Sequence, residues 1–460
     1  MSDLDRSRPQ SGRDTIASAR RAGHSGRAQK LGLGSASGLV VASMIGTGVY
    51  TTSGLMLAEG RTPLGVLSVW LVAGLLSLAG ALSYAELASI YPESGGEYAL
   101  LSRVFHPSVG FVAGIASIVL GFAAPIAACG IAFARYAGRA LGIEGAALAA
   151  IELPVALGIV LIVSLAHARE HVFTLRAQDL LTLGKLALAV LFVIAGVFSP
   201  SLEPARLLDP PMRVSEIAEP SFAFGIVLVS FAYTGWNAAV YVGGEIEDAP
   251  RTLPRALGLG TLAVTLVYLA LNALFLAAAP RDELAQLEIA HVAATHLFGA
   301  TAGRILSSMI AFGLLSTIGA FVLTGTRVYA AMGRDHAVLG KIAPLRVALV
   351  VQVLLAAVMI LTSSFDVLLG SVGVTLSLSS ALTVAGVLVV RHRGAPPHAY
   401  RTPGYPLTPI AFVLLSLGAI VAAIAYDPTV AIWGSLSIVV GLLLYLFARR
   451  GAAPETPAPR

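Results

Sequence analysis

The sequence predicts an all-α protein that crosses a membrane about twelve times. Of its 460 residues, 57% are hydrophobic and only 12% are charged, and the mean hydropathy of +0.83 exceeds that of ordinary soluble domains. A spanning helix needs about 20 apolar residues. Twelve runs reach this length, at residues 34–57, 64–90, 108–140, 147–167, 178–198, 219–244, 256–279, 302–331, 345–362, 367–391, 406–426 and 429–448.

The first and sixth runs are interrupted in the same way, by glycine and small polar residues at mid-membrane depth. The two segments are SMIGTG (Ser43 to Gly48) and FAYTGWN (Phe231 to Asn237). Because each unsatisfied backbone group in hydrocarbon costs several kcal/mol, unwound backbone is tolerated only where it lines a cavity or a ligand. Two such breaks in corresponding positions are typical of membrane transporters.

The positions of the two breaks also suggest an internal repeat. If runs one to five form one repeat and runs six to ten another, the odd number of helices inverts the second repeat relative to the first. The breaks then meet near the bilayer midplane, where we expect a substrate site. Runs eleven and twelve lie outside the repeat, and we expect them to pack at the periphery or to form oligomer contacts.

The distribution of charge predicts the orientation and the domain organisation. With the N-terminus in the cytoplasm, 22 of the 30 Lys and Arg residues lie inside and 7 outside, as the positive-inside rule requires. The polar start has no apolar region of a signal peptide. We divide the chain into a disordered cytoplasmic tail (1–30), the repeat core (31–400), helices eleven and twelve (401–448) and a cytoplasmic tail (449–460), in the cell (inner or plasma) membrane.

The same features exclude other classes of protein. Loops are short, and no catalytic constellation, metal-ligand cluster or phosphate-binding loop appears, so we expect no enzyme activity, cofactor or metal. The net charge of +5 is explained by orientation and does not require a nucleic acid partner. Cys129 is the single cysteine, and we expect it to pack within the third helix. The sequence does not determine the oligomeric state.

The two breaks offer groups of opposite polarity. After an unwound turn at Gly46, Thr47 and Gly48, the second half of the first helix presents free N–H groups and the positive end of its dipole, which suit a carboxylate. The alternative for these glycines is close helix packing. At the second break, carbonyls freed near Phe231, Ala232 and Thr234 suit an ammonium group; the seven residues from Phe231 to Asn237 form this segment.

Four segments together resemble the amino acid/polyamine/organocation superfamily, most closely its L-amino-acid transporter branch and related bacterial permeases. They are SMIGTGVY (Ser43 to Tyr50), SYAELASIYPESGGEYALLSRVF (Ser83 to Phe105), FAYTGWNAAVYVGGEIEDAPRTLPRAL (Phe231 to Leu257) and LLSTIGAFVLTGTRVYAAMGRDH (Leu314 to His336). The resemblance runs from about residue 31 to about residue 448. It implies the leucine-transporter-type fold of five plus five inverted helices, with alternating access to a central amino acid site.

The resemblance also implies roles for side chains at the second break. Phe231 matches an aromatic gate over the bound amino acid, and Trp236 and Asn237 would shape the side-chain end; packing against lipid or core is the alternative for both aromatic residues. The full predicted substrate set is Ser43, Ile45, Gly46, Thr47, Gly48, Phe231, Ala232, Thr234, Trp236 and Asn237. In the arginine/agmatine and polyamine exchangers a glutamate occupies the place of Asn237. Apart from Glu86 and Glu245 near cytoplasmic helix ends, no acidic residue lies in the middle of a span, which favours a neutral cargo.

Lys185 is the only lysine within a predicted span. Such a group is costly in the membrane and should face the interior with partners. By resemblance, it replaces a sodium ion between helices one and eight, where its partners are backbone oxygen near Ser43 or Met44 and the hydroxyls of Ser316 and Thr317. The alternative is snorkelling to the cytoplasmic interface.

Charged residues gather where helix six meets the cytoplasm, at Glu245, Glu247, Asp248, Arg251 and Arg255. They predict either an intracellular gate that includes Glu245 or a solvated helix end. The same two readings apply to Glu86, Glu97 and Arg103.

The sequence therefore favours a sodium-independent secondary transporter of neutral L-amino acids, working as a proton symporter or an exchanger. Its expected partners are the amino acid, the proton in the symport mode, and the lipid bilayer. The first alternative is a cationic amino acid or polyamine exchanger. An amino acid sensor that does not transport is the less favoured alternative.

Overall fold

The computed structural model describes residues 30–92, 95–168, 175–336, 339–342, 344–394, 396 and 400–451. Within them the protein is built from helices, and the sole β-type contact is a bridge between Leu31 and Ile246. Residues 1–29 and 452–460, which make up most of the two predicted tails, lie outside the described residues.

The first half of the chain contains the first predicted break and the helices up to the second. Its elements are α2 (Leu33–Met44), α3 (Gly48–Ala58), α4 (Pro63–Ile90), α5 (Gly96–Val104), α6 (Pro107–Ala116), the π-helical η1 (Ser117–Ala123), α7 (Ala124–Ala140), α8 (Gly145–Ala168) and α9 (Leu175–Val197), followed by the short 3-10 turns η2 (Pro204–Leu208) and η3 (Val214–Ala218). The predicted run 108–140 is thus one apolar path, α6–η1–α7, that contains a π-helical segment.

The second half begins with the other interrupted helix. Its elements are α10 (Pro220–Ala232), α11 (Ala238–Tyr241), η4 (Gly243–Glu245), α12 (Ala249–Ala278), α13 (Arg281–Leu284), α14 (Ile289–Phe298), α15 (Ala300–Asp335), α16 (Leu345–Thr362), α17 (Phe365–His392), α18 (Leu407–Tyr426), η6 (Pro428–Ala431) and α19 (Ile432–Gly451). The predicted run 219–244 is therefore two helices, because α10 ends at Ala232 and α11 is only four residues long.

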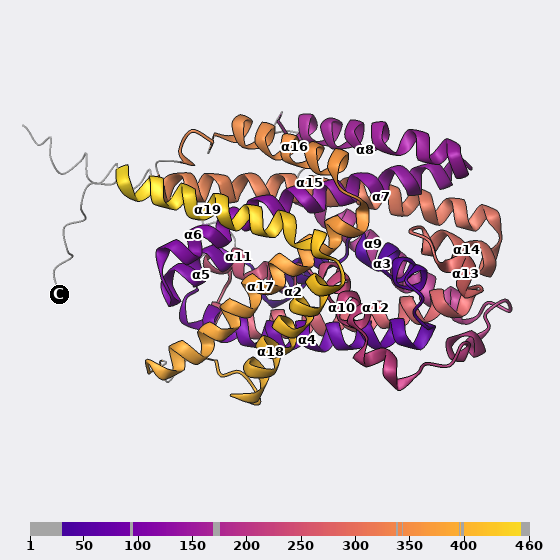
Figure 1. The fold of residues 1–460 in the computed structure, drawn as a ribbon, viewed down its shortest axis with the longest axis horizontal. Coiled ribbons are helices and arrows are strands. Elements are labelled where there is room, and N and C mark those ends of the chain that lie inside the picture. The colour runs from indigo at the N-terminus through magenta and orange to yellow at the C-terminus, as the bar shows by residue number, and fades with distance from the viewer. Residues whose placement is uncertain are drawn as a thin grey trace, which may run out of the picture.

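Ten of the described helical segments are long and apolar enough to cross a membrane. They correspond to ten of the twelve predicted runs. The fifth and sixth runs correspond to shorter apolar helices, Leu183–Val197 within α9 and Pro220–Ala232. In Figure 1, α8 and α16 lie together on one side of the molecule, α18 lies on the opposite side, and α2, α3 and α10 pass through the middle.

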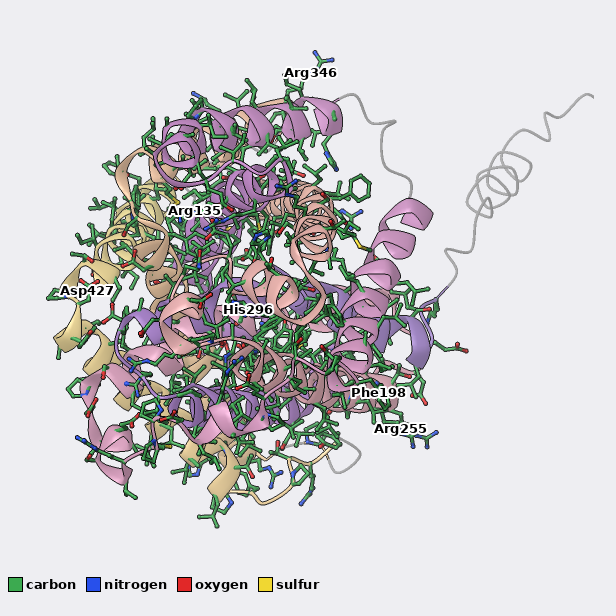
Figure 2. The ribbon with its side chains drawn as sticks, turned by 90° about the vertical axis from the view of Figure 1, so that its right-hand side faces the viewer. Arg135, Phe198, Arg255, His296, Arg346 and Asp427 are labelled. Carbon is green, nitrogen blue, oxygen red and sulfur yellow. The ribbon has the colours of Figure 1, made fainter. Side chains whose placement is uncertain are left out.

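The outer surface is apolar along its helices and charged at its edges. Exposed leucine, isoleucine and valine side chains project from α8, α16, α18 and α19, as expected for faces that contact lipid. Figure 2 shows Arg255, Arg346 and Asp427 at the outer edge of the molecule. The polar backbone of the two breaks, by contrast, lies inside.

Candidate substrate site at the two helix breaks

The first break leaves backbone donors without intrahelical partners. Helix α2 ends at Met44 and α3 begins at Gly48. The Ile45 N–H donates to the Val41 carbonyl at 3.2 Å, and the Tyr50 N–H donates to the Thr47 carbonyl at 2.9 Å. Within the described part of the chain, the N–H groups at 47, 48 and 49 donate to no backbone carbonyl. They are available to an anionic group at the start of α3.

The second break turns the chain at Gly235, whose φ of +100° lies in the left-handed region that favours glycine. Two of the three predicted carbonyls already accept hydrogen bonds. The Phe231 carbonyl accepts from the Thr234 N–H at 3.0 Å and from the Thr234 hydroxyl at 2.7 Å. The Ala232 carbonyl accepts one hydrogen bond, from Tyr268 at 3.2 Å, and keeps a lone pair. The carbonyls best suited to an ammonium group are thus those of Ala232 and Thr234.

The two breaks touch each other through glycines. A Cβ added to Gly48 would lie 2.4 Å from the Cβ of Ala232, and one added to Gly235 would lie 2.6 Å from the Ser43 carbonyl oxygen. Gly46 is different, since its nearest neighbour, Thr317 Cγ2, would be 3.9 Å away. Close packing therefore explains Gly48, whereas Gly46 leaves open space beside the backbone.

A small cavity lies between the breaks. Its volume is about 10 Å³, roughly the space that one water needs, so an amino acid fits only when the surrounding helices move apart. The lining residues are Ser43, Met44, Gly46, Thr47, Gly48, Cys129, Phe231, Ala232, Thr234, Thr317 and Phe321. Most of the predicted substrate residues thus share one cavity, and Met44, Cys129 and Phe321 join them without having been predicted.

Tyr268 of α12 holds the two breaks together. Its side chain is fully buried, and its hydroxyl lies 2.6 Å from the Met44 carbonyl oxygen and 3.2 Å from that of Ala232. One hydroxyl therefore contacts a carbonyl oxygen in the last turn of α2 and another in the last turn of α10. The sequence signal for this residue is weak, because a lone tyrosine in a spanning run is common.

Lys185 is half-buried and points inward. Its Nζ donates to the Thr317 hydroxyl at 2.8 Å, and its alkyl chain passes Gly313 of α15. Thr317 itself lines the cavity, and neighbouring Ser316 is buried. The inward hydrogen bond argues against snorkelling. No hydrogen bond from Lys185 to Ser43 or Met44 occurs among the residues that the structure describes, and the role of Lys185 in place of sodium stays a prediction.

Three predicted substrate residues lie outside the cavity lining. Ile45 is buried nearby. Trp236 packs edge-on against Tyr84, with ring centroids 4.7 Å apart, and the Asn237 amide donates to Glu97 at 3.1 Å. The turn at Gly235 sends both side chains away from the cavity.

The predicted acidic gate residues have very different surroundings. Glu97 is 2% exposed and accepts hydrogen bonds from four side chains. Glu86 is 1% exposed and pairs with Arg391 at 2.6 and 2.8 Å. Neither is a solvated helix end. Glu245 is exposed, and no ion pair of its side chain occurs among the described residues.

The sequence predicts Glu97 as part of a gate or as a solvated helix end, and it does not indicate the contact with the second break, because Glu97 belongs to α5, between two spanning helices. A possible signal was the glycine pair before it. Gly95 and Gly96 have φ values of +137° and +58°, which set the turn that directs Glu97 into the protein.

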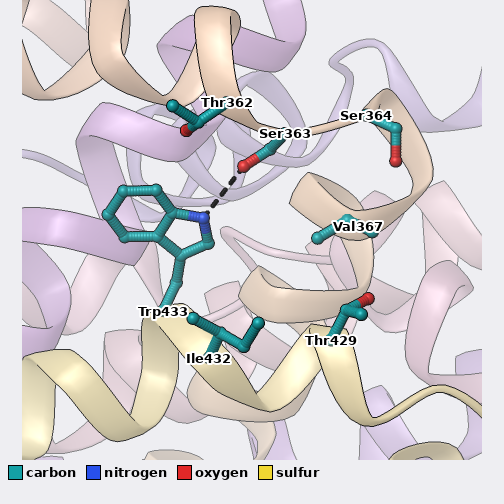
Figure 3. A pocket seen from close by; sticks show the side chains of 7 residues that line it. All are labelled: Thr362, Ser363, Ser364, Val367, Thr429, Ile432 and Trp433. Atoms are coloured by element: carbon teal, nitrogen blue, oxygen red, sulfur yellow. Dashed lines mark hydrogen bonds between the residues drawn. The ribbon is translucent and has the colours of Figure 1, made fainter.

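A larger cavity lies elsewhere, between the end of α16 and the starts of α17 and α19 (Figure 3). The Trp433 indole N–H donates to the Ser363 hydroxyl at 2.9 Å there. The cavity shares no lining residue with the breaks. Among the described residues, no group of three or more His, Cys, Asp or Glu side chains lies together in a way that could hold a metal ion.

Apolar helices around a central cavity, two of them interrupted where they line it, define an integral membrane transport protein. The chain belongs to the amino acid permease family, whose model matches residues 31–448. This confirms the family resemblance of the sequence.

The relatives are amino acid transporters and exchangers, and the match covers most of each of them. The chain is 28% identical to large neutral amino acids transporter small subunit 2 of Oryctolagus cuniculus, over 91% of this chain and 80% of that protein. It is 28% identical to the serine/threonine exchanger SteT of Bacillus subtilis, over 91% of this chain and 95% of that protein. It is 22% identical to b(0,+)-type amino acid transporter 1 of Homo sapiens, over 91% of this chain and 87% of that protein. The family and these relatives are transporters and not enzymes.

Proposed function

We propose that the protein is a sodium-independent secondary transporter of neutral L-amino acids that works by alternating access, as a proton symporter or an exchanger. In this proposal twelve helices cross the cell membrane, helices one to five and six to ten form inverted repeats, and both termini are cytoplasmic. The single observation that carries it is the cavity between two helix breaks of opposite polarity. The names of the relatives, which include a neutral amino acid transporter and a serine/threonine exchanger, support it.

The cavity suits both charged groups of an amino acid. Its carboxylate would accept hydrogen bonds from the N–H groups of Thr47, Gly48 and Val49, where the dipole of α3 is positive. Its ammonium would donate to the carbonyls of Ala232 and Thr234. Phe231, which lines the cavity, would cover the bound molecule.

The lining favours a neutral side chain. No lining residue carries a carboxylate, so a second positive charge on the cargo would be desolvated without compensation. One observation favours the alternative of a cationic substrate, namely the contact of Glu97 with Asn237. The carboxylate of Glu97, however, is already occupied by four donors. Competition between leucine or alanine and arginine or putrescine in a binding assay separates the two, and we expect the cations to lose.

The hydrogen bond from Lys185 to Thr317 supports the proposed sodium independence, because the resemblance implies that such a lysine replaces a sodium ion. The test is amino acid uptake into proteoliposomes with and without sodium and with and without an inward proton gradient, for native protein and Lys185→Ala. We expect native uptake to ignore sodium and the variant to lose transport. Sodium-stimulated native uptake would contradict the role of Lys185. Uptake without any response to the proton gradient would leave exchange as the mode.

A further inference from the structure

Glu97 is a carboxylate buried where charge is expensive. It lies on α5, which connects two spanning helices, and yet its side chain is 2% exposed. The start of α5 is fixed against α11, because the Gly95 N–H donates to the Tyr241 carbonyl at 3.3 Å and the ring of Tyr241 packs against Gly96. A side chain at Gly96 would meet that ring at 2.2 Å. The turn therefore holds Glu97 in place.

Donors from three other parts of the fold meet on this carboxylate. The Tyr84 hydroxyl of α4 donates to Oε1 at 2.6 Å, the Asn237 amide at 3.1 Å and the Ser380 hydroxyl of α17 at 3.2 Å. The Ser379 hydroxyl contacts Oε2. One carboxyl group thus joins α5 to α4, to α17 and to the second helix break.

No cation neutralises Glu97 within the described ranges. The titratable groups that face it from the packed elements are the phenols of Tyr84 and Tyr241. The charged residues near the same ends of α4 and α17, Glu86 and Arg391, bind each other. A buried carboxylate without a cation favours its protonated form. Burial raises the pKa of the Glu97 carboxyl, and the hydrogen bonds from its partners partly offset that rise.

The contact with Asn237 connects this carboxyl to the cavity. Asn237 lies three residues after Thr234, which lines the cavity, and directly before α11. If the second break opens by a movement of α11, Asn237 leaves Glu97 and water reaches the carboxyl. Water stabilises the charged form, so the open arrangement binds the proton more weakly than the closed one.

We propose that Glu97 is a proton-binding site that latches the second helix break closed, so that proton binding and access to the central cavity exclude each other. This inference adds a proton-binding site to the proposed transport function and rests on that function. Because the closed state has the higher pKa, the latch is fully closed below the ordinary carboxyl pKa of about 4.3 and is released as pH rises through the higher value of the closed state.

The thiol of Cys129 can report whether the cavity is open. Cys129 is the only cysteine, it is 1% exposed, and it lines the cavity between the breaks. A charged methanethiosulfonate reagent therefore reacts with this thiol only when the cavity opens. Cys129→Ala provides the blank for non-specific labelling.

The experiment measures the rate of Cys129 modification in proteoliposomes from pH 5 to pH 8 for native protein and Glu97→Gln. Glutamine preserves the size of the side chain and stays uncharged, so it imitates the protonated latch. Dividing the native rate by the variant rate at each pH removes the titration of the thiol itself. We expect a ratio of about ten or more at pH 8 that falls steadily as the pH is lowered to 5. A ratio that does not change with pH overturns the proposal.

Tyr84→Phe tests the geometry with little risk to folding. It removes the shortest of the three donors to Oε1, so the charged form loses stabilisation in the closed state. With Tyr84→Phe, the pH at which the labelling ratio falls should then be about one pH unit higher than with Tyr84 present. An unshifted profile overturns the proposal. Amino acid uptake by the same proteoliposomes, with exchange and with an inward proton gradient, is measured separately. The absence of both modes contradicts the proposed transport and does not affect the labelling result.

Discussion

Gly48 and Gly46 lie two residues apart in the first break but meet different surroundings, which gives a matched pair of substitutions. In Gly48→Ala the new methyl would lie 2.4 Å from the Ala232 Cβ and 2.5 Å from its Cα. Ordinary contact is about 3.5–4.0 Å, so the two breaks must separate by roughly 1 Å. Overpacking of this kind costs about 1–3 kcal/mol, or about 5- to 150-fold in an equilibrium constant.

The methyl of Gly46→Ala would lie 3.9 Å from Thr317 Cγ2 and 4.0 Å from the Met44 carbonyl oxygen, so it should leave packing intact. It adds a methyl to the cavity lining and should weaken binding of the amino acid carboxylate. The assay is the thermal unfolding midpoint of purified protein with and without a neutral amino acid. We expect Gly48→Ala to lower the midpoint of the unliganded protein. Gly46→Ala should keep that midpoint and lose the stabilisation by ligand. Equal unliganded midpoints for the two variants would refute this account of the breaks.

Two further substitutions test the contacts around the cavity. Tyr268→Phe removes the hydroxyl beside the Met44 and Ala232 carbonyls, which should cost about 1–3 kcal/mol and lower the unfolding midpoint; an unchanged midpoint contradicts the bridging role. Thr317→Val keeps the shape of the side chain but removes the hydrogen bond to Lys185. Exchange in proteoliposomes should be lost with Thr317→Val and retained with Thr317→Ser, and equal exchange by both would show that the hydroxyl is not needed.

The breaks could be located from sequence because their cause is local. Glycine and small polar residues at corresponding places in two apolar runs indicate unwound backbone, and α2 and α10 do end at Met44 and Ala232. The contact of Lys185 with Thr317 was also predictable, because a buried ammonium needs oxygen partners.

The directions of side chains after the second break could not be predicted. Trp236 and Asn237 were assigned to the substrate, but the left-handed Gly235 turns them towards Tyr84 and Glu97. A glycine in the sequence indicates that such a turn is allowed, but it does not specify the backbone φ and ψ angles of the turn.

The burial of Glu97 could not be predicted, for a related reason. Its burial depends on α4, α17 and the second break, which are distant in sequence and meet only in the folded chain. The Ser379 and Ser380 hydroxyls lie more than 280 positions away along the chain. Charge in a short connecting helix usually indicates a solvated surface, and the sequence alone gave equal weight to that reading.

A structure of the protein with a bound neutral amino acid tests the central claim most directly. The account predicts the ligand between the two breaks, with its carboxylate on the N–H groups of Thr47, Gly48 and Val49 and its ammonium on the carbonyls of Ala232 and Thr234. A ligand bound with the opposite polarity, or outside the space between α3 and α10, would contradict it.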